Sequence, residues 1–395
     1  MIITILGGAG LMGAGIIRDL LSDRCIIDIT TIRLCDAARP RMEALLAELS
    51  DPRIELVDLD VADGAILSAA IAGSDLCINC VPTLLGFQMA IFEAALTAKV
   101  HYVDLGGLGT FTVKQLAEHD RFKAAGVTAV IGCGADPGMS NVICRAVADQ
   151  LDEIDSIKLY WAAEFVGEEN PVLVPPYSIS TVLAEYAQES TQFYGGEHVT
   201  CAPMSGREIL ELPEPWGSCE FMHSPHSEQL TVPLADGIRE KGIKEFSWKL
   251  HLPHREHEAW VGLVKAGFGD FAEPVVINNV EISPLDVLQK VINRNIERNR
   301  DRIPEQDSHE IHFAIGKGRK NGKPATVRVE VIVEPDPIYA PYVDACTSMN
   351  GSIAAQLMLA GTMKPGVWAP EEYFEVSPYF AELAKRKFKV ASYME

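Results

Sequence analysis

Short apolar runs and amphipathic segments alternate through the first third of the chain. The apolar runs are rich in β-branched residues, which predicts strands that are buried on both faces of a parallel sheet. The segments between them carry apolar positions at helical spacing. The expected strands are 2–6, 30–34, 54–58, 76–80, 101–103 and 127–131, and the expected helices are 10–21, 41–49, 64–71, 87–97 and 113–125. This alternation predicts an α/β fold with a Rossmann doubly wound parallel sheet.

The pattern changes after Asp149, where strands, loops and a proline-rich stretch replace the regular alternation. Alternating segments and a hairpin around 317–322 predict an inserted α+β domain with an antiparallel sheet. The expected strands are 157–161, 246–252, 260–265, 310–316 and 325–333, and the expected helices are 180–188, 284–295 and 348–359. We therefore expect a Rossmann domain over 1–150, an α+β substrate and dimerisation domain over 151–343, and a return to the Rossmann domain over 344–395.

The first expected strand runs directly into Gly8-x-Gly10-x-x-Gly13, which opens the first expected helix. In a dinucleotide fingerprint, the first glycine permits the tight turn, the second lets the backbone approach a pyrophosphate, and the third lets helix and strand pack closely. The helix N-terminus then presents free N–H groups to the phosphates. A glycine-rich turn can also simply join two elements. The residues expected to contact the dinucleotide here are Gly8, Ala9, Gly10, Leu11, Met12 and Gly13.

The end of the second strand carries Asp36, about 20 residues after the fingerprint. An acid at this place accepts the ribose hydroxyls and repels a 2′-phosphate, which favours NAD as the cofactor. Arg33, Arg39 and Arg41 lie nearby in the sequence, so NADP remains possible. An ordinary loop acid is the other interpretation of Asp36.

Further candidates follow the third and fourth strands, because ligands of a doubly wound sheet lie outside the carboxyl ends of its strands. Asp60, with Val61 beside it, either binds the adenine amino group or caps the next helix. Asn79, Val81 and Pro82 are expected to line the nicotinamide ribose.

The fifth and sixth strands end in glycine-containing motifs, Asp104-Leu-Gly-Gly107 and Gly132-Cys-Gly-Ala-Asp-Pro-Gly-Met139. Glycines allow close backbone approach at such a crevice. Asp136 either binds an amine or takes a proton, or it caps the helix expected over 140–151.

Together these motifs resemble the saccharopine dehydrogenase family. The likeness also includes His223-Ser-Pro-His-Ser-Glu228 followed by Thr231-Val-Pro233, and it covers most of 2–162 and about 345–370. Within the family, the lysine 6-dehydrogenases are the most similar, through Met139-Ser-Asn141 and Gln150-Leu-Asp-Glu153.

The resemblance implies a homodimer and hydride transfer between NAD(P) and a nitrogen-bearing carbon of an amino acid or polyamine. It also implies that Ala135, Asp136 and Pro137 touch both cofactor and substrate. A residue with a pKa near the working pH handles the amine proton, and we expect Asp136 and His226 in this role. The substrate-binding residues that the resemblance implies are Gly106, Gly107, Pro137, Gly138, His223 and Glu228. A polar surface loop is the other interpretation of His226 and Glu228.

One departure from the family pattern concerns the substrate carboxylate. No arginine directly follows Val232-Pro233, so the substrate need not be saccharopine. A guanidinium fork suits a carboxylate, and the remaining cationic candidates are Arg207, Arg239, Lys249 and Arg255.

Composition narrows the classes of partner. The chain has 395 residues, 48% of them hydrophobic, and a net charge of -21. Nucleic acids and anionic membranes need a positive protein surface, so neither is expected as a partner. Met1 leads directly into a strand, and no apolar run reaches the roughly 18 residues of a membrane span. We therefore expect a cytoplasmic protein with a small-molecule substrate.

Neither cysteines nor histidines predict a metal or redox centre. The nine cysteines are scattered, as for free thiols in a reducing compartment, and Cys77-x-x-Cys80 sits at a strand end. His254-x-x-His257 lies in an expected loop or strand end, and His309-x-x-His312 leads into a strand, where this spacing puts the rings on opposite faces. No metal is expected.

The leading hypothesis is an NAD(P)-dependent oxidoreductase acting on the C–N bond of an amino acid, L-lysine among them, or of its secondary-amine conjugate. One alternative is reductive condensation of the carboxynorspermidine type, which runs in the opposite direction with NADPH. Another is a non-catalytic protein that binds NAD as a sensor.

Overall fold

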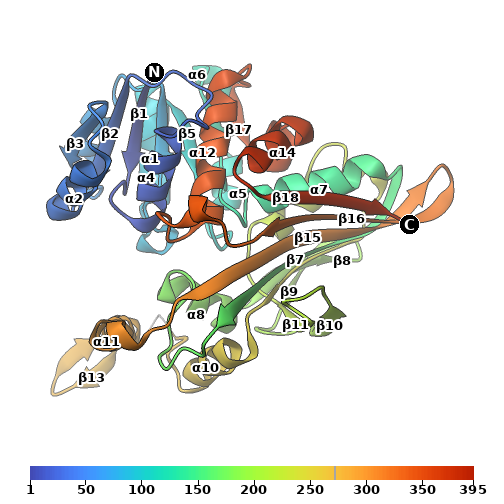
Figure 1. Ribbon diagram of the computed structural model, residues 1–395. Helices are drawn as coiled ribbons and strands as arrows, with labels where there is room; N and C mark the ends of the chain where they lie inside the picture. The colour runs from blue at the N-terminus through green and yellow to red at the C-terminus, as the bar shows by residue number, and fades with distance from the viewer. Residues whose placement is uncertain (271–272) are drawn as a thin grey trace.

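The computed structural model describes residues 1–270 and 273–395. Its first domain contains a 7-stranded parallel sheet in the order β17-β6-β5-β4-β1-β2-β3 (Figure 1). The strands are β1 (Ile2–Leu6), β2 (Thr31–Asp36), β3 (Ile54–Asp58), β4 (Leu76–Asn79), β5 (His101–Asp104), β6 (Thr128–Val130) and β17 (Gly366–Trp368). The Rossmann order of six strands is extended at one edge by β17, so the predicted fold class is confirmed.

The helices of the first domain follow the predicted alternation. They are α1 (Leu11–Leu20), α2 (Arg39–Leu49), α3 (Gly64–Ile71), α4 (Gln88–Ala98), α5 (Thr112–Leu116) and α6 (His119–Ala125). The single helix expected over 113–125 is therefore two helices. The break lets α5 turn Gln115 toward Asp104 at the end of β5, while Phe122 on α6 enters the core.

The second domain is built on a 9-stranded sheet in the order β10-β11-β12-β7-β15-β16-β18, with β8 paired to β12 and β9. Its strands are β7 (Glu153–Gly167), β8 (Ser190–Tyr194), β9 (Glu197–Cys201), β10 (Glu208–Glu211), β11 (Ser218–His223), β12 (Glu245–His251), β15 (Gln306–Lys320), β16 (Lys323–Val333) and β18 (Lys389–Met394). The expected all-antiparallel sheet is wrong in one place, because β12 pairs with β7 in parallel. The long connection between these strands provides the crossover that a parallel pair needs.

The helices of the second domain include one that the sequence pattern misassigns. They are α8 (Ile179–Ala187), α9 (Glu228–Thr231), α10 (His254–Lys265) and α11 (Pro284–Arg298). The expected strand 260–265 and the loop around His254 and His257 both belong to α10. Trp260 is the one fully buried side chain of α10, and the apolar residues of the helix are concentrated between Ala259 and Val264, where a short run resembles a strand.

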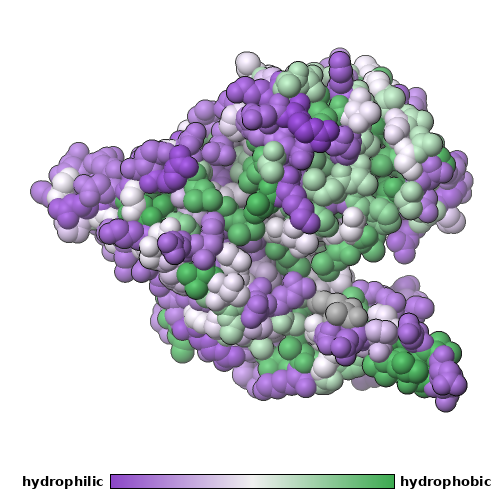
Figure 2. All heavy atoms as spheres, turned by 180° about the vertical axis from the view of Figure 1, so that it is seen from behind, coloured by the Kyte–Doolittle hydropathy of each residue, from purple (hydrophilic) through white to green (hydrophobic). Residues whose placement is uncertain are grey.

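A small hairpin projects from the second domain beside α11 (Figure 1). It consists of β13 (Val275–Ile277) and β14 (Val280–Ile282). Its side chains Val275, Val276, Ile277 and Val280 are all more than half exposed. Figure 2 shows an apolar patch at the end of this projection, so the hairpin presents an aliphatic surface that its own chain leaves uncovered.

The chain passes between the two sheets three times. After β6 it enters α7 (Met139–Gln150), which packs on β15 and β16 of the second sheet. It returns through α12 (Ala345–Ala360), which packs against α1, and adds β17 and α13 (Pro370–Tyr373). After α14 (Val376–Lys385) it leaves again, and β18 pairs with β16. The segment expected to return over 344–395 therefore contributes to both sheets.

A buried ion-pair cluster ties this C-terminal segment to α1. The guanidinium of Arg386 has an exposed fraction of 0%, as has the side chain of Asp19. Its Nη2 lies 2.7 Å from Asp19 Oδ2, and its Nη1 lies 2.9 Å from Glu382 Oε2. The carboxylates of Asp19 and Glu382 compensate the buried charge of Arg386, which would otherwise destabilise the core.

Candidate functional site

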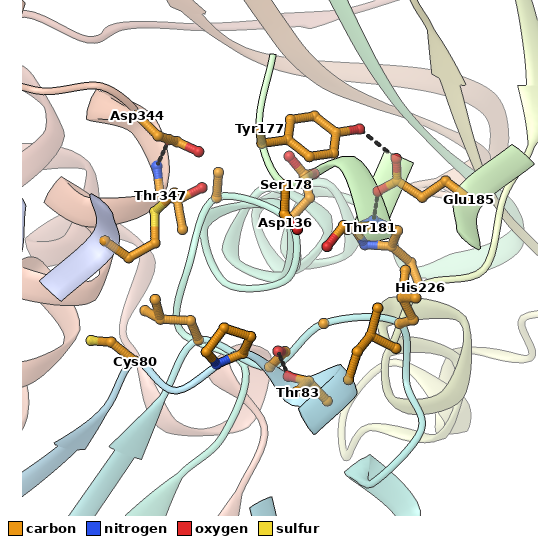
Figure 3. Close-up of a pocket in the computed structure, with 18 of the residues that line it drawn as sticks. Cys80, Thr83, Asp136, Tyr177, Ser178, Thr181, Glu185, His226, Asp344 and Thr347 are labelled. Atoms are coloured by element: carbon orange, nitrogen blue, oxygen red, sulfur yellow. Dashed lines mark hydrogen bonds and ion pairs between the residues drawn. The ribbon is translucent and has the colours of Figure 1, made fainter. Parts of the chain in front are cut away.

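A cavity of about 260 Å³ lies between the strand ends of the first sheet and one face of the second sheet. The loops after β4, β5 and β6 form one side, and α8 with β7, β12 and β15 forms the other (Figure 3). The predicted residues that line it are Met12, Asn79, Val81, Pro82, Gly106, Gly107, Ala135, Asp136 and His226. The strand-end rule thus located the cavity from sequence.

The glycine fingerprint forms the tight strand-to-helix turn that a diphosphate requires. A Cβ on Gly13 would lie 2.5 Å from Gly7 O and 2.6 Å from Gly8 Cα, so only glycine fits. Gly10 precedes α1 without a side-chain cap, which leaves N–H groups of the first turn available to an anion. The left-handed residue of the turn is Gly7, with φ +70°. The cradle fits the diphosphate of NAD(P).

The acids after β2 and β3 occupy different settings. Asp36 accepts the N–H of Ala9 at 3.2 Å and that of Ala38 at 2.9 Å, which fixes its carboxylate beside the fingerprint. Asp60 accepts the N–H of Ala62 at 2.9 Å within a turn, and Val61 is half-buried. The cap of α3 is Asp63, so the capping interpretation of Asp60 is wrong.

Asp104 at the end of β5 holds three strand-end loops together. Its Oδ1 accepts the N–H groups of Gly106 at 2.9 Å and Gly132 at 2.8 Å. Its Oδ2 accepts the side-chain amides of Gln88 at 2.6 Å and Gln115 at 2.7 Å. Burial raises the pKa of Asp104, and these hydrogen bonds oppose the rise. One carboxylate therefore sets the positions of the glycine loops that border the cavity.

Replacing Asp104 with Asn is expected to destabilise the fold by about 1–3 kcal/mol, because one acceptor becomes a donor that faces N–H groups in a buried site. The measurement is the shift of the urea unfolding midpoint. The matched control is Asp63→Asn at the exposed cap of α3, where the amide oxygen still accepts the N–H groups of Ala65 and Ile66. Equal shifts in the two variants would contradict this role of Asp104.

Asp136 is placed in the cavity by a turn that requires glycine. Gly138 has φ +131°, and a Cβ there would lie 2.1 Å from Gly134 O. Gly138 is the N-cap of α7, so the interpretation of Asp136 as that cap is wrong. Asp136 Oδ2 lies 2.5 Å from His312 Nδ1, whereas its buried Oδ1 has no hydrogen bond of good geometry. Burial would raise the pKa of Asp136, but the neighbouring His312 outweighs it and holds the pKa below its ordinary value.

His312 is the main site residue that the sequence analysis missed. Its Nε2 lies 3.4 Å from Cys346 Sγ on α12 and 3.4 Å from Glu310 Oε2 on its own strand. Glu310 and His312 are two residues apart in β15 and share one face of the strand. The pair Glu310-x-His312 is the local sequence signal for this part of the site, whereas the His309-x-x-His312 spacing is not. Cys346 comes from a distant helix, and no local pattern connects it to β15.

His226 is buried between two carboxylates and an indole. Its Nδ1 lies 3.2 Å from Glu228 Oε2, and its Nε2 lies 3.5 Å from Glu185 Oε1. Its ring stacks on Trp248 with centroids 3.8 Å apart and an interplanar angle of 11°. Glu185 also accepts the hydroxyl of Tyr177 (Figure 3). Burial would lower the pKa of His226, but Glu228 and Glu185 raise it to about 10. The surface-loop interpretation of His226 and Glu228 is therefore wrong.

The raised pKa of His226 predicts a pH-dependent stability. The charged form stabilises the fold fully below the unfolded-state pKa of 6.5, and this contribution is lost as pH rises toward about 10. The difference in unfolding free energy between the wild type and His226→Gln should therefore shrink from pH 6.5 to 10. Chemical denaturation across this range measures it. His254→Gln, at an exposed side chain, should run parallel to the wild type.

Several predicted substrate contacts lie outside the cavity wall. Arg207 faces Glu220 at 3.5 Å, and Arg239 pairs with Glu240 at 3.0 Å on the surface. Lys249 pairs with Glu208, and Arg255 lies 2.6 Å from Glu169. In this conformation each of the four cations proposed to bind the substrate carboxylate is paired with an acidic residue of its own chain.

The other predicted substrate residues lie behind the wall. His223 is buried against Tyr194 at 2.9 Å, and burial together with Lys249 lowers its pKa to about 4. Glu228 is fully buried and accepts the hydroxyl of Ser140 at 2.7 Å. Pro137 packs close to Gly106, where an added Cβ would lie 2.8 Å from its ring. These residues shape and support the wall without forming its surface.

The cavity is lined by acids, aromatic rings and two histidines, His226 and His312, whose raised pKa values favour their charged forms. The carboxylates of Asp136, Glu185, Glu310 and Asp344 border it, with the indoles of Trp161 and Trp248. Within residues 1–270 and 273–395, no lysine or arginine belongs to its wall. Burial raises the pKa of Asp344 to about 6. Such a wall suits a cationic guest, since carboxylates and aromatic faces both attract ammonium groups.

Two family descriptions match most of the chain. The saccharopine dehydrogenase NADP binding domain matches residues 3–130, and the saccharopine dehydrogenase C-terminal domain matches residues 134–388. The boundary between them falls just before the loop that carries Asp136.

Curated relatives match parts of the chain. A carboxyaminopropylagmatine dehydrogenase from Synechocystis sp. is 31% identical over 157 residues, which cover 36% of this chain and 38% of that protein. Carboxynorspermidine synthase from Vibrio cholerae is 26% identical over 64% of this chain and 60% of its own length. The enzyme of that name from Vibrio alginolyticus is 34% identical over 54% of this chain and 48% of its own length.

Among solved structures, an apo saccharopine dehydrogenase (L-Glu forming) from Saccharomyces cerevisiae is similar over 100% of this chain and 99% of its own. The TM-score is 0.72 at 14% sequence identity. This likeness extends through both domains and concerns the fold.

Within the described residues, no helix has the length and apolarity to cross a membrane.

Proposed function

Because this chain belongs to the saccharopine dehydrogenase family and carries its NAD(P)-binding domain, we propose that it makes or breaks a C–N bond in a cationic amino acid or polyamine conjugate. The observation that carries the proposal is the buried Asp136 Oδ1, which has no hydrogen bond of good geometry in a cavity bordered by four carboxylates. The indole N–H of Trp248 is the near donor of its own chain, and it too lacks a well-formed hydrogen bond. A buried acceptor of this kind is satisfied when a ligand brings a donor. The N–H group of an ammonium ion is such a donor.

The residues around the cavity divide the work between them. When bound, NAD(P) exchanges a hydride with the carbon that carries the nitrogen. Asp136 contacts that nitrogen through Oδ1 and is the proposed catalytic carboxylate. His226 has both ring nitrogens directed to carboxylates, so we assign it the positioning of Glu185 rather than proton transfer. Trp161 and Trp248 exclude water and present ring faces to the cation.

A substrate panel run in both directions tests the proposal. Oxidation of L-lysine, diamines and carboxyalkyl polyamines is followed at alkaline pH by the absorbance of reduced cofactor. Reductive condensation of an aldehyde with a diamine or agmatine is followed by the loss of the absorbance of reduced cofactor. We expect turnover with cationic substrates and much weaker turnover with saccharopine, which carries three carboxylates. A panel without turnover in either direction, but with saturable cofactor binding, would favour the NAD-sensing alternative.

The reductive direction is the second candidate function. The names of the relatives refer to carboxylated derivatives of agmatine and norspermidine, which are cationic amines. This supports a condensing reductase over L-lysine 6-dehydrogenase, and the acidic cavity is compatible with both. Comparison of kcat/KM for oxidation of L-lysine with kcat/KM for reductive condensation of an aldehyde with a diamine or agmatine decides between them.

We propose NAD as the preferred cofactor, because Asp36 is fixed beside the fingerprint and Arg39 is engaged by Glu43 at 2.9 Å and Asp58 at 3.0 Å. The Asp36 carboxylate then repels a 2′-phosphate. Asp36→Ser should shift the ratio of kcat/KM for NAD over NADP by about tenfold or more toward NADP, which corresponds to about 1.4 kcal/mol. A matched substitution, Asp28→Ser, should leave the ratio unchanged. A ratio that already favours NADP in the wild type would contradict the assignment.

We also propose a homodimer, and we expect neither nucleic acid nor a membrane as a partner. The exposed aliphatic hairpin β13–β14 is a surface that association would cover. Light scattering should give twice the mass of the chain, and replacing Val276 and Val280 with Ser should lower it. An unchanged mass in that double variant would remove the hairpin from the interface.

A further inference from the structure

A second chemical feature lies at one end of the cavity, where β15 meets α12. Glu310, His312 and Cys346 each direct a ligand atom to one point, and these atoms all lie within 4.8 Å of one another. We infer that the three side chains form a binding site for a divalent cation of the zinc type. The site goes beyond the proposed function, since hydride transfer with NAD(P) does not require it.

The two separations that involve His312 fit tetrahedral coordination, and the ligand atoms of Cys346 and Glu310 lie within 4.8 Å of each other. His312 Nε2 lies 3.4 Å from Cys346 Sγ and 3.4 Å from Glu310 Oε2. Zinc–ligand distances of about 2.0–2.3 Å at tetrahedral angles place neighbouring ligand atoms about 3.3–3.8 Å apart. The observed separations therefore leave room for one ion at the centre of the cluster.

The surroundings orient each ligand as metal sites require. The second ring nitrogen of His312, Nδ1, lies 2.5 Å from Asp136 Oδ2, which is the carboxylate–histidine arrangement found behind metal-bound imidazoles. The indole N–H of Trp161 donates to Glu310 Oε2 at 3.1 Å. The side-chain amide of Asn350 donates to the backbone oxygen of Cys346 at 2.8 Å and lies 3.9 Å from its sulfur. Two ligands stand on a strand and one on a helix, so the frame is rigid.

The donor set selects the kind of ion. A thiolate, an imidazole and a carboxylate suit zinc and related transition metals, whereas magnesium and calcium prefer oxygen ligands alone. His312 and Cys346 are each only 1% exposed. Glu310 and His312 border the cavity, while Cys346 lies behind them. A bound ion would therefore keep an open fourth position toward the cavity, for water or a ligand nitrogen or oxygen.

Metal analysis of the full chain tests the inference. Protein produced with zinc supplementation and then desalted should contain about one zinc per chain by plasma mass spectrometry. Cobalt substitution should give a thiolate-to-cobalt charge-transfer band in the near ultraviolet. The band should disappear in Cys346→Ser and persist in Cys219→Ser, a buried cysteine of the second domain that lies outside the cluster. Circular dichroism confirms that both variants are folded.

A second variant keeps the test decisive if Cys346→Ser does not fold. Glu310→Gln alters a partly exposed side chain, and competition with a chromophoric chelator should show zinc affinity at least tenfold weaker than in the wild type. Wild-type protein without stoichiometric zinc or a thiolate–cobalt band would overturn the site. Zinc affinity equal to that of the wild type in both Glu310→Gln and Cys346→Ser would overturn it as well. These readouts need no turnover, so they stand apart from the substrate assays.

Discussion

Asp136→Asn is expected to lower kcat about 100- to 10,000-fold, the range associated with loss of a group that contacts the reacting atoms. The substitution removes the charge that attracts the substrate cation and replaces one acceptor oxygen with a donor. The loop 134–138 should keep its shape, because its turn depends on Gly138 and not on the carboxylate. Steady-state kinetics with the best substrate of the panel measures the loss.

Cofactor affinity separates this effect from misfolding. Titration of reduced cofactor by fluorescence should give nearly the wild-type dissociation constant for Asp136→Asn, since the fingerprint lies on another loop. Asp23→Asn is the matched control, because its side chain is 94% exposed and far from the strand ends. A variant of Asp136 that keeps more than about a tenth of the wild-type kcat would refute its assignment as the catalytic carboxylate.

Arg386→Met is expected to cost about 3–5 kcal/mol of folding free energy, because it leaves the buried carboxylate of Asp19 without its main partner. Urea denaturation followed by circular dichroism measures the change. The double variant Asp19→Leu, Arg386→Met should recover part of the loss, since it removes both buried charges together.

The control for the buried arginine is an exposed one. Arg121→Met removes two ion pairs, to Glu93 at 2.7 Å and Glu118 at 2.6 Å, from a side chain that is 56% exposed. Solvent screens such pairs, so the unfolding midpoint should barely move. If the two methionine variants unfolded at the same midpoint, burial would not explain the role of Arg386.

The first domain was predictable because its signals are local. The first six strands of the parallel sheet are short segments rich in apolar residues, and the glycines that the turns require stand at fixed offsets from them. The edge strand β17 has only three residues and was not predicted. The strand-end rule then placed Asn79, Gly106 and Asp136 at one edge of the sheet without knowledge of their contacts. The same rule does not say which strand-end side chains are buried. It therefore could not show that Asp104, rather than the neighbouring glycines, holds the loops together through hydrogen bonds.

The second domain was less predictable because its pairing is long-range. The parallel partner of β12 lies across a connection that no sequence period describes. The sequence 260–265 of α10 mixes apolar and other residues over a few positions, as the sequence of the short strand β12 does. A pattern this short does not distinguish a helix from a strand. His226 was found through the family motif, whereas Glu185 and His312 join the site only through tertiary packing. The arginines proposed as carboxylate clamps, Arg207 and Arg239, lie outside the cavity wall in this structure and pair with local acids.

The three crossings of the chain between its sheets bear on how molecules gain entry. Each crossing connects the same two domains, so the domains can move apart less than they could if a single hinge segment joined them. A guest must then reach the cavity without a wide separation of the two domains. Slender, extended compounds should pass more quickly than branched ones of equal affinity, and this filter on shape would operate before any carboxylate is reached.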